Sequence, residues 1–402
     1  MSTTRHGALL SAAIAAHQAG RLLEAKAGYE RVLRRSPSDP DALHFLGLLH
    51  FHQRDGAKAV GLIRRSLAIA PGNPHAWNNL GNIFVTQAKS TEAKEAYTRA
   101  LALAPDMVDA WYNLGVCLRD ERAFEEAVRH FRAALDRQPG FLRAYEALGM
   151  LHYRLGQFEA AADVYRRWTA HDPANPIARH MAAATSGLDV PARAEDAYVA
   201  NVFDKYAAAF DENLKALGYR APELVATALA ERIPTQAGGL AILDAGCGTG
   251  LCGPLLRPFC RTLIGVDLSP KMIEHARVRG GYDDLIVGEL CAFMREHAQS
   301  YDAIVSADTL VYFGALEEAC AAACNALRGG GLLVFTVEAL RGDASEPYCL
   351  QVHGRYAHRE GYVREILQQC GFEVEHLSRV VLRMERLEEV TGFLTVASKS
   401  PR

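Results

Sequence analysis

The sequence lacks three features that would each define a class of protein. Its nine cysteines are scattered and contain no Cys-x-x-Cys pair, so neither a disulfide framework nor a bound metal is indicated. Its net charge of −3 leaves no basic field to hold a nucleic-acid backbone. No apolar run approaches the length that crosses a bilayer. These absences favour a cytoplasmic protein with reduced thiols that binds neither nucleic acid nor membrane.

The length and hydrophobic content favour two domains. The chain has 402 residues, more than one ordinary core needs, and half of them are hydrophobic. The alanine-rich residues 7–16 have some features of a signal peptide. We expect them instead to be helical, because they fall in the register of a repeat.

A period of 34 residues runs through the first half of the chain. Five prolines and five alanines keep this spacing: Pro37, Pro71, Pro105, Pro139 and Pro173, with Ala42, Ala76, Ala110, Ala144 and Ala178. The third period carries Trp77, Leu80, Gly81, Phe84, Ala93, Tyr97, Ala100 and Pro105. This pattern resembles the tetratricopeptide repeat, a helix pair in which small residues allow close packing and proline ends the second helix. The resemblance covers residues 9–178 and implies an α-solenoid.

Two asparagines occupy equivalent places on the expected concave face of this solenoid. Asn79 and Asn113 lie one period apart. Because a side-chain amide both donates and accepts hydrogen bonds, the pair can hold a protein or peptide backbone. Equally, the two can be solvated residues that space the helices.

A glycine-rich loop organises the second half. Leu240–Leu243 is expected to be a buried strand, and the run Asp244–Gly250 follows it with glycines on alternate positions. A helix is expected from about Leu251. The spacing does not fit the dinucleotide fingerprint Gly-x-Gly-x-x-Gly, which weakens a nicotinamide oxidoreductase. A second strand, residues 262–266, ends at Asp267, where a carboxylate can bind ribose hydroxyls.

The sequence Asp-Ala-Gly-Cys-Gly-Thr-Gly resembles motif I of the class I S-adenosylmethionine (SAM) methyltransferases. The resemblance implies a Rossmann-like, mostly parallel seven-stranded sheet with an antiparallel C-terminal hairpin. It also implies that the motif I loop binds the methionine part of SAM, that Asp267 binds the ribose and that Glu289 binds the adenine amino group. Met272 is the candidate for an apolar adenine contact, or else an ordinary core residue. The cofactor-binding residues implied are Asp244, Ala245, Gly246, Cys247, Gly248, Gly250, Asp267, Leu268, Met272, Glu289, Leu290 and Ala307.

A segment with three aromatic residues precedes the first strand. In residues 202–212, Phe203, Tyr206 and Phe210 fall on one helical face, which by itself indicates a core-facing stripe. The segment also resembles the lid helix of small-substrate class I methyltransferases. In that case Tyr206 can pack against the sulfonium of SAM.

Candidate catalytic residues follow the fourth and fifth strands. Asp308 and Tyr312 come after residues 301–306, and Glu338 closes the strand at 332–337. The segment 354–358 adds Tyr356 and His358. His358 has the ordinary pKa range of a general base, with Glu338, Asp308 and Tyr356 as alternatives. A histidine that is merely hydrogen-bonded is the competing interpretation.

The arrangement as a whole resembles bacterial fusions of tetratricopeptide repeats with a class I methyltransferase. The expected domains are residues 1–185 for the repeats, 186–196 for a linker and 197–402 for the methyltransferase with its lid. The predicted function is SAM-dependent methylation of a small molecule or a protein side chain, with the repeats binding protein. The alternative is a scaffold whose methyltransferase-like domain binds SAM without catalysis.

Overall fold

The computed structural model describes residues 2–233, 238–342, 345–385 and 388–400. The chain forms two compact units, residues 1–164 and 165–402. The division precedes the repeat boundary expected at residue 185. Among the described helices, none is long and apolar enough to cross a membrane.

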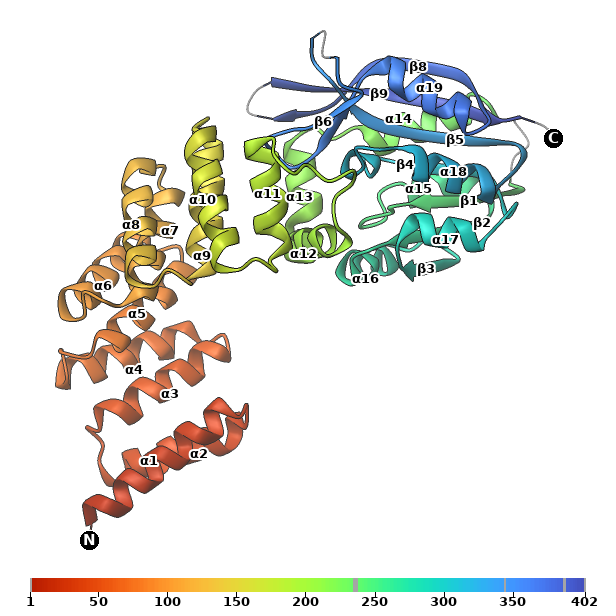
Figure 1. Ribbon diagram of the computed structural model, residues 1–402. Coiled ribbons are helices and arrows are strands. Elements are labelled where there is room, and N and C mark those ends of the chain that lie inside the picture. The colour runs from red at the N-terminus through yellow and green to blue at the C-terminus, as the bar shows by residue number, and fades with distance from the viewer. Residues whose placement is uncertain (1, 234–237, 343–344, 386–387, 401–402) are drawn as a thin grey trace. The chain divides into compact units, whose positions relative to one another are not determined.

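Successive helix pairs build the first unit (Figure 1). The helices are α1 (Ser2–Gln18), α2 (Leu22–Arg35), α3 (Pro40–His52), α4 (Gly56–Ile69), α5 (Pro74–Thr86), α6 (Ser90–Leu103), α7 (Val108–Asp120), α8 (Phe124–Arg137) and α9 (Leu142–Arg154), and α10 (Phe158–His171) spans the division. Each expected proline lies just beyond a second helix, as Pro71 follows α4. A Cβ on Gly81 would lie 2.5 Å from the Tyr97 ring, so this pair of positions packs as the repeat pattern predicts.

The second unit is a sheet covered by helices on both faces. Its helices are α11 (Pro176–Ser186), α12 (Asp196–Tyr206), η1 (Ala207–Ala209), α13 (Phe210–Ala216), α14 (Ala221–Ala230), α15 (Gly253–Leu256), η2 (Arg257–Phe259), α16 (Pro270–Arg279), α17 (Leu290–Glu296), η3 (Leu310–Tyr312), α18 (Glu317–Ala326) and α19 (Glu360–Gln369). Its strands are β1 (Leu240–Ala245), β2 (Cys260–Asp267), β3 (Asp284–Val287), β4 (Tyr301–Ser306), β5 (Leu327–Ala339), β6 (Tyr348–Leu350), β7 (Tyr356–His358), β8 (Phe372–Glu385) and β9 (Glu388–Lys399).

The strand order places three carboxyl ends side by side. Within the described residues the order is β3-β2-β1-β4-β5-β7-β6, and β9 joins β5 antiparallel and pairs with β8. β1 runs parallel between β2 and β4, so that Asp244 is in register with Gly265 on one side and Val305 on the other. The loops after these strands therefore meet at one edge of the sheet, where open α/β sheets bind ligands.

Two apolar clusters hold the helices on the sheet. On one face α17, α18 and α19 contribute buried residues such as Met294, Ala322 and Val363. On the other face α14 and α15 contribute residues such as Leu229 and Leu256. The expected mostly parallel sheet with an antiparallel closing hairpin is confirmed, and the short strands β6 and β7 extend it.

One local expectation differs from the structure. The helix expected from Leu251 is the single turn α15, because Pro258 lacks the N–H that would bond to the carbonyl of Pro254 and continue the helix, and a 3-10 turn follows. The cysteines are not uniformly buried: six are buried, Cys324 and Cys370 are half-buried, and Cys349 is exposed. All nine are free thiols.

Helix α11 belongs to the core of the second unit. Its Ala183 and Ala184 pack against Leu350 and Tyr356 of the β6–β7 pair. His180 is buried, bonds through Nε2 to the Gly354 carbonyl oxygen at 2.9 Å and stacks on Tyr198. Burial lowers the pKa of His180, so this contact involves a neutral imidazole.

Candidate functional site

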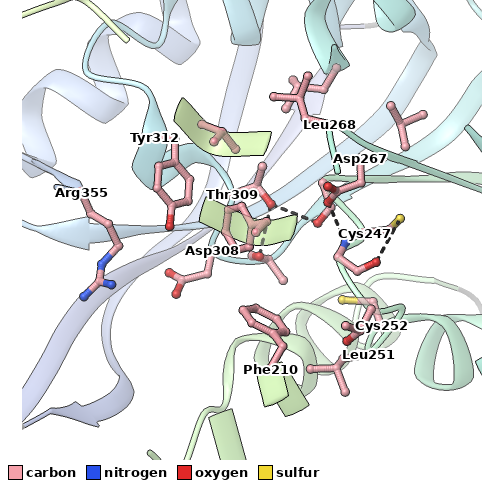
Figure 2. A pocket seen from close by; sticks show the side chains of 18 of the residues that line it. Phe210, Cys247, Leu251, Cys252, Asp267, Leu268, Asp308, Thr309, Tyr312 and Arg355 are labelled. Atoms are coloured by element: carbon pink, nitrogen blue, oxygen red, sulfur yellow. Dashed lines mark hydrogen bonds between the residues drawn. The ribbon is translucent and has the colours of Figure 1, made fainter. Parts of the chain in front are cut away.

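A pocket opens beyond the carboxyl ends of β1, β2 and β4, beneath the segment α12–α13. Its empty volume, which includes the open solvent at its mouth, is about 1200 Å³. Figure 2 shows this pocket with Asp267 and Cys247 at one end and Asp308, Tyr312 and Arg355 at the other. The sequence-predicted residues that line it are Gly246, Cys247, Gly248, Asp267, Leu268, Glu289, Leu290, Ala307 and Asp308.

The motif I loop is held close to β2 by its own backbone. The N–H groups of Gly246 and Cys247 both donate to the Val266 carbonyl oxygen, at 2.9 and 3.0 Å. Gly246 has φ +83°, and a Cβ there would lie 2.2 Å from the side chain of Thr309. Gly248 has φ +54°, and a Cβ there would meet nothing within 4 Å. The loop therefore needs glycine at both positions for its backbone, and the space beside Gly248 is open.

Asp267 ties the loop to the end of β2. Its Oδ2 accepts from the Gly248 N–H and its Oδ1 from the Ser269 N–H, both at 2.9 Å. Burial raises the pKa of Asp267, and these two N–H groups act in the opposite direction. The carboxylate lines the pocket and stays close to motif I, the position that the sequence predicts for it.

Asp244 is not among the residues that line the pocket, so the contact with the cofactor that the resemblance implies, direct or through water, stays a prediction. It is fully buried, and its Oδ2 accepts a 2.6 Å hydrogen bond from the Tyr282 hydroxyl. Its Oδ1 has no partner among the described residues. Burial raises the pKa of Asp244 to about 7. The Tyr282 ring fills a slot where a Cβ on Gly253 or Gly265 would lie within 3.0 Å of it, so Asp244 and Tyr282 support the loop from beneath.

Three other expected cofactor contacts also lie outside the pocket lining. Met272 is fully buried in α16, where the Ser269 cap accepts its N–H, so it is a core residue. Ala245 is buried at the end of β1. Gly250, with φ +84°, packs against Tyr282 and Ala276 instead of facing the pocket.

Glu289 lines the pocket with its carboxylate already engaged. It caps α17 by accepting from the N–H groups of Cys291 and Ala292, and it pairs with Arg193 at 2.9 Å. Burial alone would raise the pKa of Glu289, but these donors lower it. The adenine contact predicted for Glu289 therefore stays a prediction, and Arg193 is a neighbour that the sequence did not reveal.

The lid consists of α12, η1 and α13 instead of one continuous helix. Phe203 and Phe210 line the pocket and meet edge to face, whereas Tyr206 is not among the lining residues. The lid is fastened at two points. Asp204 accepts from the Ser269 hydroxyl at 2.5 Å, and Asp211 accepts from the Thr249 hydroxyl at 2.6 Å and also pairs with Arg279.

An ion network forms the other end of the pocket. Arg383, only 3% exposed, donates to Asp308 Oδ2 at 2.6 Å and to Glu385 at 2.7 Å, and it also pairs with Glu338. Arg355 donates to Glu338 at 2.7 Å and to Glu385 at 2.6 Å. Asp308, Arg355, Arg383 and Glu385 all line the pocket. The sequence did not reveal Arg383 or Glu385, because they come from the closing hairpin far along the chain.

The predicted base His358 lies outside the pocket lining. It is fully buried in β7, where its Nε2 contacts the Gly314 carbonyl oxygen at 3.1 Å, and burial lowers its pKa to about 4. Tyr356, also fully buried, donates its hydroxyl to the Pro191 carbonyl oxygen at 2.7 Å. Glu338 is buried beneath the network, and although burial acts against it, His353 and the two arginines hold its pKa well below the usual range. None of His358, Tyr356 and Glu338 is among the residues that line the pocket, so their positions do not favour the predicted role of a catalytic base.

Asp308 and Tyr312 are the two remaining candidates at this end. Asp308 has φ +58°, an uncommon backbone conformation for a residue with a side chain. Its N–H donates to the Thr336 hydroxyl oxygen at 2.9 Å, which fixes it at the end of β4. Burial raises the pKa of Tyr312 to about 12, so it stays protonated. The ring of Tyr312 also meets Phe203 of the lid edge to face.

In the first unit, the two predicted ligand-binding asparagines contact neighbouring helices. Asn79 Nδ2 contacts His44 Nε2 at 3.0 Å. Asn113 Nδ2 donates to Asn78 Oδ1 at 3.2 Å and to Asn82 Oδ1 at 3.0 Å. Both side chains are half-buried. The contacts of their amide nitrogens agree with the interpretation that these asparagines space the helices.

Comparisons with known proteins agree with this architecture. A family model described as a methyltransferase domain matches residues 243–335, and a tetratricopeptide-repeat model matches residues 10–74, 78–140 and 118–176. Human methyltransferase-like protein 27 is 35% identical over 141 residues, which are 33% of this chain and 55% of that protein. The human mitochondrial ubiquinone biosynthesis O-methyltransferase is 30% identical over 105 residues, 24% of this chain and 28% of that protein. The chain thus spans about half or less of the length of these relatives.

The chain is also similar to solved structures of repeat proteins. MamA of Desulfovibrio magneticus RS-1 is 19% identical, with 42% of this chain and 96% of that chain covered and a TM-score of 0.39. By the family-model matches, the chain combines tetratricopeptide repeats with a methyltransferase domain.

Proposed function

We propose that the second unit transfers a methyl group from SAM to a small molecule or a protein side chain. The motif I loop carries this proposal: it leaves open space beside Gly248 and is hydrogen-bonded to the Asp267 carboxylate within the pocket lining. A loop without side chains allows close approach of a ligand, and a carboxylate at this strand end accepts hydrogen bonds from ribose hydroxyls. The residues present thus fit SAM.

The protein's main task in such a transfer is alignment. SAM supplies an electrophilic methyl group on a sulfonium. Gly246, Gly248 and Asp267 would hold the cofactor, and Phe203 and Phe210 of the lid would keep water from the reacting atoms.

Calorimetry with SAM and with its demethylated product tests the cofactor site. We expect binding at submillimolar concentration and an affinity reduced about 10- to 100-fold in Asp267→Asn, because a charged hydrogen-bond acceptor is lost. Asp284→Asn is the matched control, since Asp284 is exposed on β3. Absence of SAM binding by the wild-type protein would overturn the proposal.

Incubation with methyl-labelled SAM and a cell extract tests catalysis. Label transferred to a recipient, and lost in Asp267→Asn, supports the enzyme. SAM binding without transfer to any recipient would instead favour the alternative, a scaffold that binds SAM without catalysis.

We further propose that the repeats bind a protein partner. The match to the tetratricopeptide family supports this role. If Asn79 and Asn113 contribute to binding, the double variant Asn79→Ala/Asn113→Ala should lose labelling of macromolecular recipients while its affinity for SAM stays unchanged. Undiminished labelling would remove these two residues from the binding face.

A further inference from the structure

The pocket end opposite motif I has an excess of negative charge. Arg355 and Arg383 are surrounded by three carboxylates, those of Asp308, Glu338 and Glu385. The two guanidinium groups and three carboxylates sum to −1, and the His353 imidazole lies beside them, with its Nε2 3.3 Å from Glu338 Oε2. Each guanidinium already donates to at least two of the carboxylates, so neither arginine is available as the sole partner of an incoming anion.

One carboxylate oxygen of this network has no partner. Asp308 Oδ2 accepts from Arg383, but Oδ1 is buried and has no hydrogen-bond partner among the described residues. Figure 2 shows the Asp308 carboxylate and the Tyr312 hydroxyl directed toward the same part of the pocket. A buried carboxylate oxygen without a donor is costly, so a ligand that brings an N–H or O–H group to Oδ1 would be favoured.

The walls beside this group are apolar and aromatic. Phe203, Phe210 and Leu214 of the lid line the pocket, with Tyr219 before α14. An aromatic ring face and an unpaired carboxylate both favour a cation. Burial raises the pKa of Asp308, although Arg383 opposes this shift, and a carboxylate of raised pKa accepts a proton more readily.

We propose that the methyl acceptor is an amine with an apolar body, and that Asp308 Oδ1 binds its nitrogen. This inference rests on the proposed methyltransferase function and names the acceptor class of the same site. In the reaction the bound ammonium first gives one proton to the Asp308 carboxylate, and the nitrogen lone pair that this frees forms the bond to the methyl carbon. The product is a methylammonium. The carbon–sulfur bond of SAM breaks, and its electron pair stays on sulfur.

Two sources of a cationic nitrogen can satisfy Asp308: an acceptor amine, and the α-ammonium of SAM itself. Binding measurements distinguish them. Calorimetry with SAM alone reports the cofactor, and titration of the protein saturated with the demethylated cofactor reports the acceptor end. Phenethylamine and 3-phenylpropionate are matched probes, because they share a phenyl ring and a short chain and differ in the sign of charge.

We expect the saturated wild-type protein to bind phenethylamine at least about tenfold more tightly than 3-phenylpropionate. In Asp308→Asn the amine affinity should fall about 10- to 100-fold, while SAM affinity stays close to that of the control Asp284→Asn. The melting temperature should fall, because Arg383 loses one of its buried charged partners. With labelled SAM, we expect the wild-type protein to methylate phenethylamine and not 3-phenylpropionate.

Three outcomes would overturn the inference. The first is preference of the wild-type protein for the carboxylate probe or for neither probe, a result that does not depend on any variant folding. The second is unchanged amine binding in Asp308→Asn. The third is a large loss of SAM affinity in that variant, which would assign Asp308 to the α-ammonium of the cofactor. Failure of the wild-type protein to bind SAM would instead be failure of the proposed function.

Discussion

At the scale of single residues, the side chains beneath motif I matter as much as those that line the pocket. Asp244 is fully buried and its Oδ2 bonds to the hydroxyl of Tyr282. Because the tyrosine ring fills the slot between Gly253 and Gly265, the pair fixes the height of the loop above the sheet. Asp244 is thus a positioning residue.

We predict that Tyr282→Phe destabilises the protein. The substitution keeps the ring and removes only the donor to a buried carboxylate, so the free energy of unfolding should fall by about 1–3 kcal/mol. Thermal or denaturant unfolding measures this change. Tyr348→Phe is the control, because the Tyr348 hydroxyl has no hydrogen bond among the described residues. Equal stability of the two variants would contradict the role of the bond.

Asp244 also predicts a pH dependence of stability. Burial raises its pKa to about 7, whereas the unfolded value is about 3.9. Between these values the folded chain holds a proton that the unfolded chain releases, so this group's contribution to stability falls as pH rises from about 4 to 7 and is then constant. The melting temperature should therefore fall more steeply over this range in the wild-type protein than in Asp244→Asn. Parallel curves of melting temperature against pH for the two proteins would contradict this role of Asp244.

At the scale of elements, the segment α12–α13, which the sequence predicts to be a lid, is fastened by side chains at both of its helices. Asp204 on α12 bonds to the cap of α16, and Asp211 on α13 bonds to Thr249 of motif I and to Arg279. The lid therefore contacts the loop that would hold the cofactor. Its opening and closing should be coupled to cofactor binding.

We predict that Asp211→Ala weakens SAM binding about 3- to 10-fold, with most of the change in the dissociation rate. The estimate is modest because Asp211 and Arg279 are partly exposed and solvent screens their attraction. Stopped-flow displacement of a fluorescent SAM analogue measures the rate. Glu212→Ala changes the next, exposed residue of the same helix and should leave the rate unaltered. If both variants behave alike, Asp211 does not fasten the lid.

The sequence predicts those elements whose signals are local. The period of 34 residues and the glycines of motif I depend on packing within a few turns of the chain. The repeats and the methyltransferase fold that they predict are confirmed. The partnership of Asp308 with Arg383 is different, because the two residues are 75 positions apart and meet only when the closing hairpin joins β5. The prediction of a base at His358 has a related weakness, because its polar neighbours in the sequence gave no sign that β7 is buried throughout.

At the scale of the whole molecule, α11 links the end of the repeat pattern to the second unit. Ala178 keeps the repeat spacing, yet His180, Ala183 and Ala184 of the same helix pack in the second core. The stability of fragments with and without α11 therefore decides where the domain boundary lies. We propose that an independent methyltransferase unit begins before α11.

We predict that residues 173–402 form a more stable fragment than residues 187–402. Removal of α11 exposes the β6–β7 surface and leaves the Gly354 carbonyl without His180, a loss of about 2–4 kcal/mol. For a unit of this size the melting temperature should differ by roughly 4–16 °C. Differential scanning calorimetry measures it, with SAM affinity as a check of folding. Equal melting temperatures would place the boundary after α11.

The left-handed backbone of Asp308 restricts which mutations this position can accept. Aspartate, asparagine and glycine tolerate φ near +58° best, and an aspartate codon becomes an asparagine or a glycine codon by a single nucleotide change. A random mutagenesis library can therefore remove the charge at this end of the pocket in one step without distorting the chain. Selection in the laboratory for a changed acceptor should recover substitutions at codon 308 early.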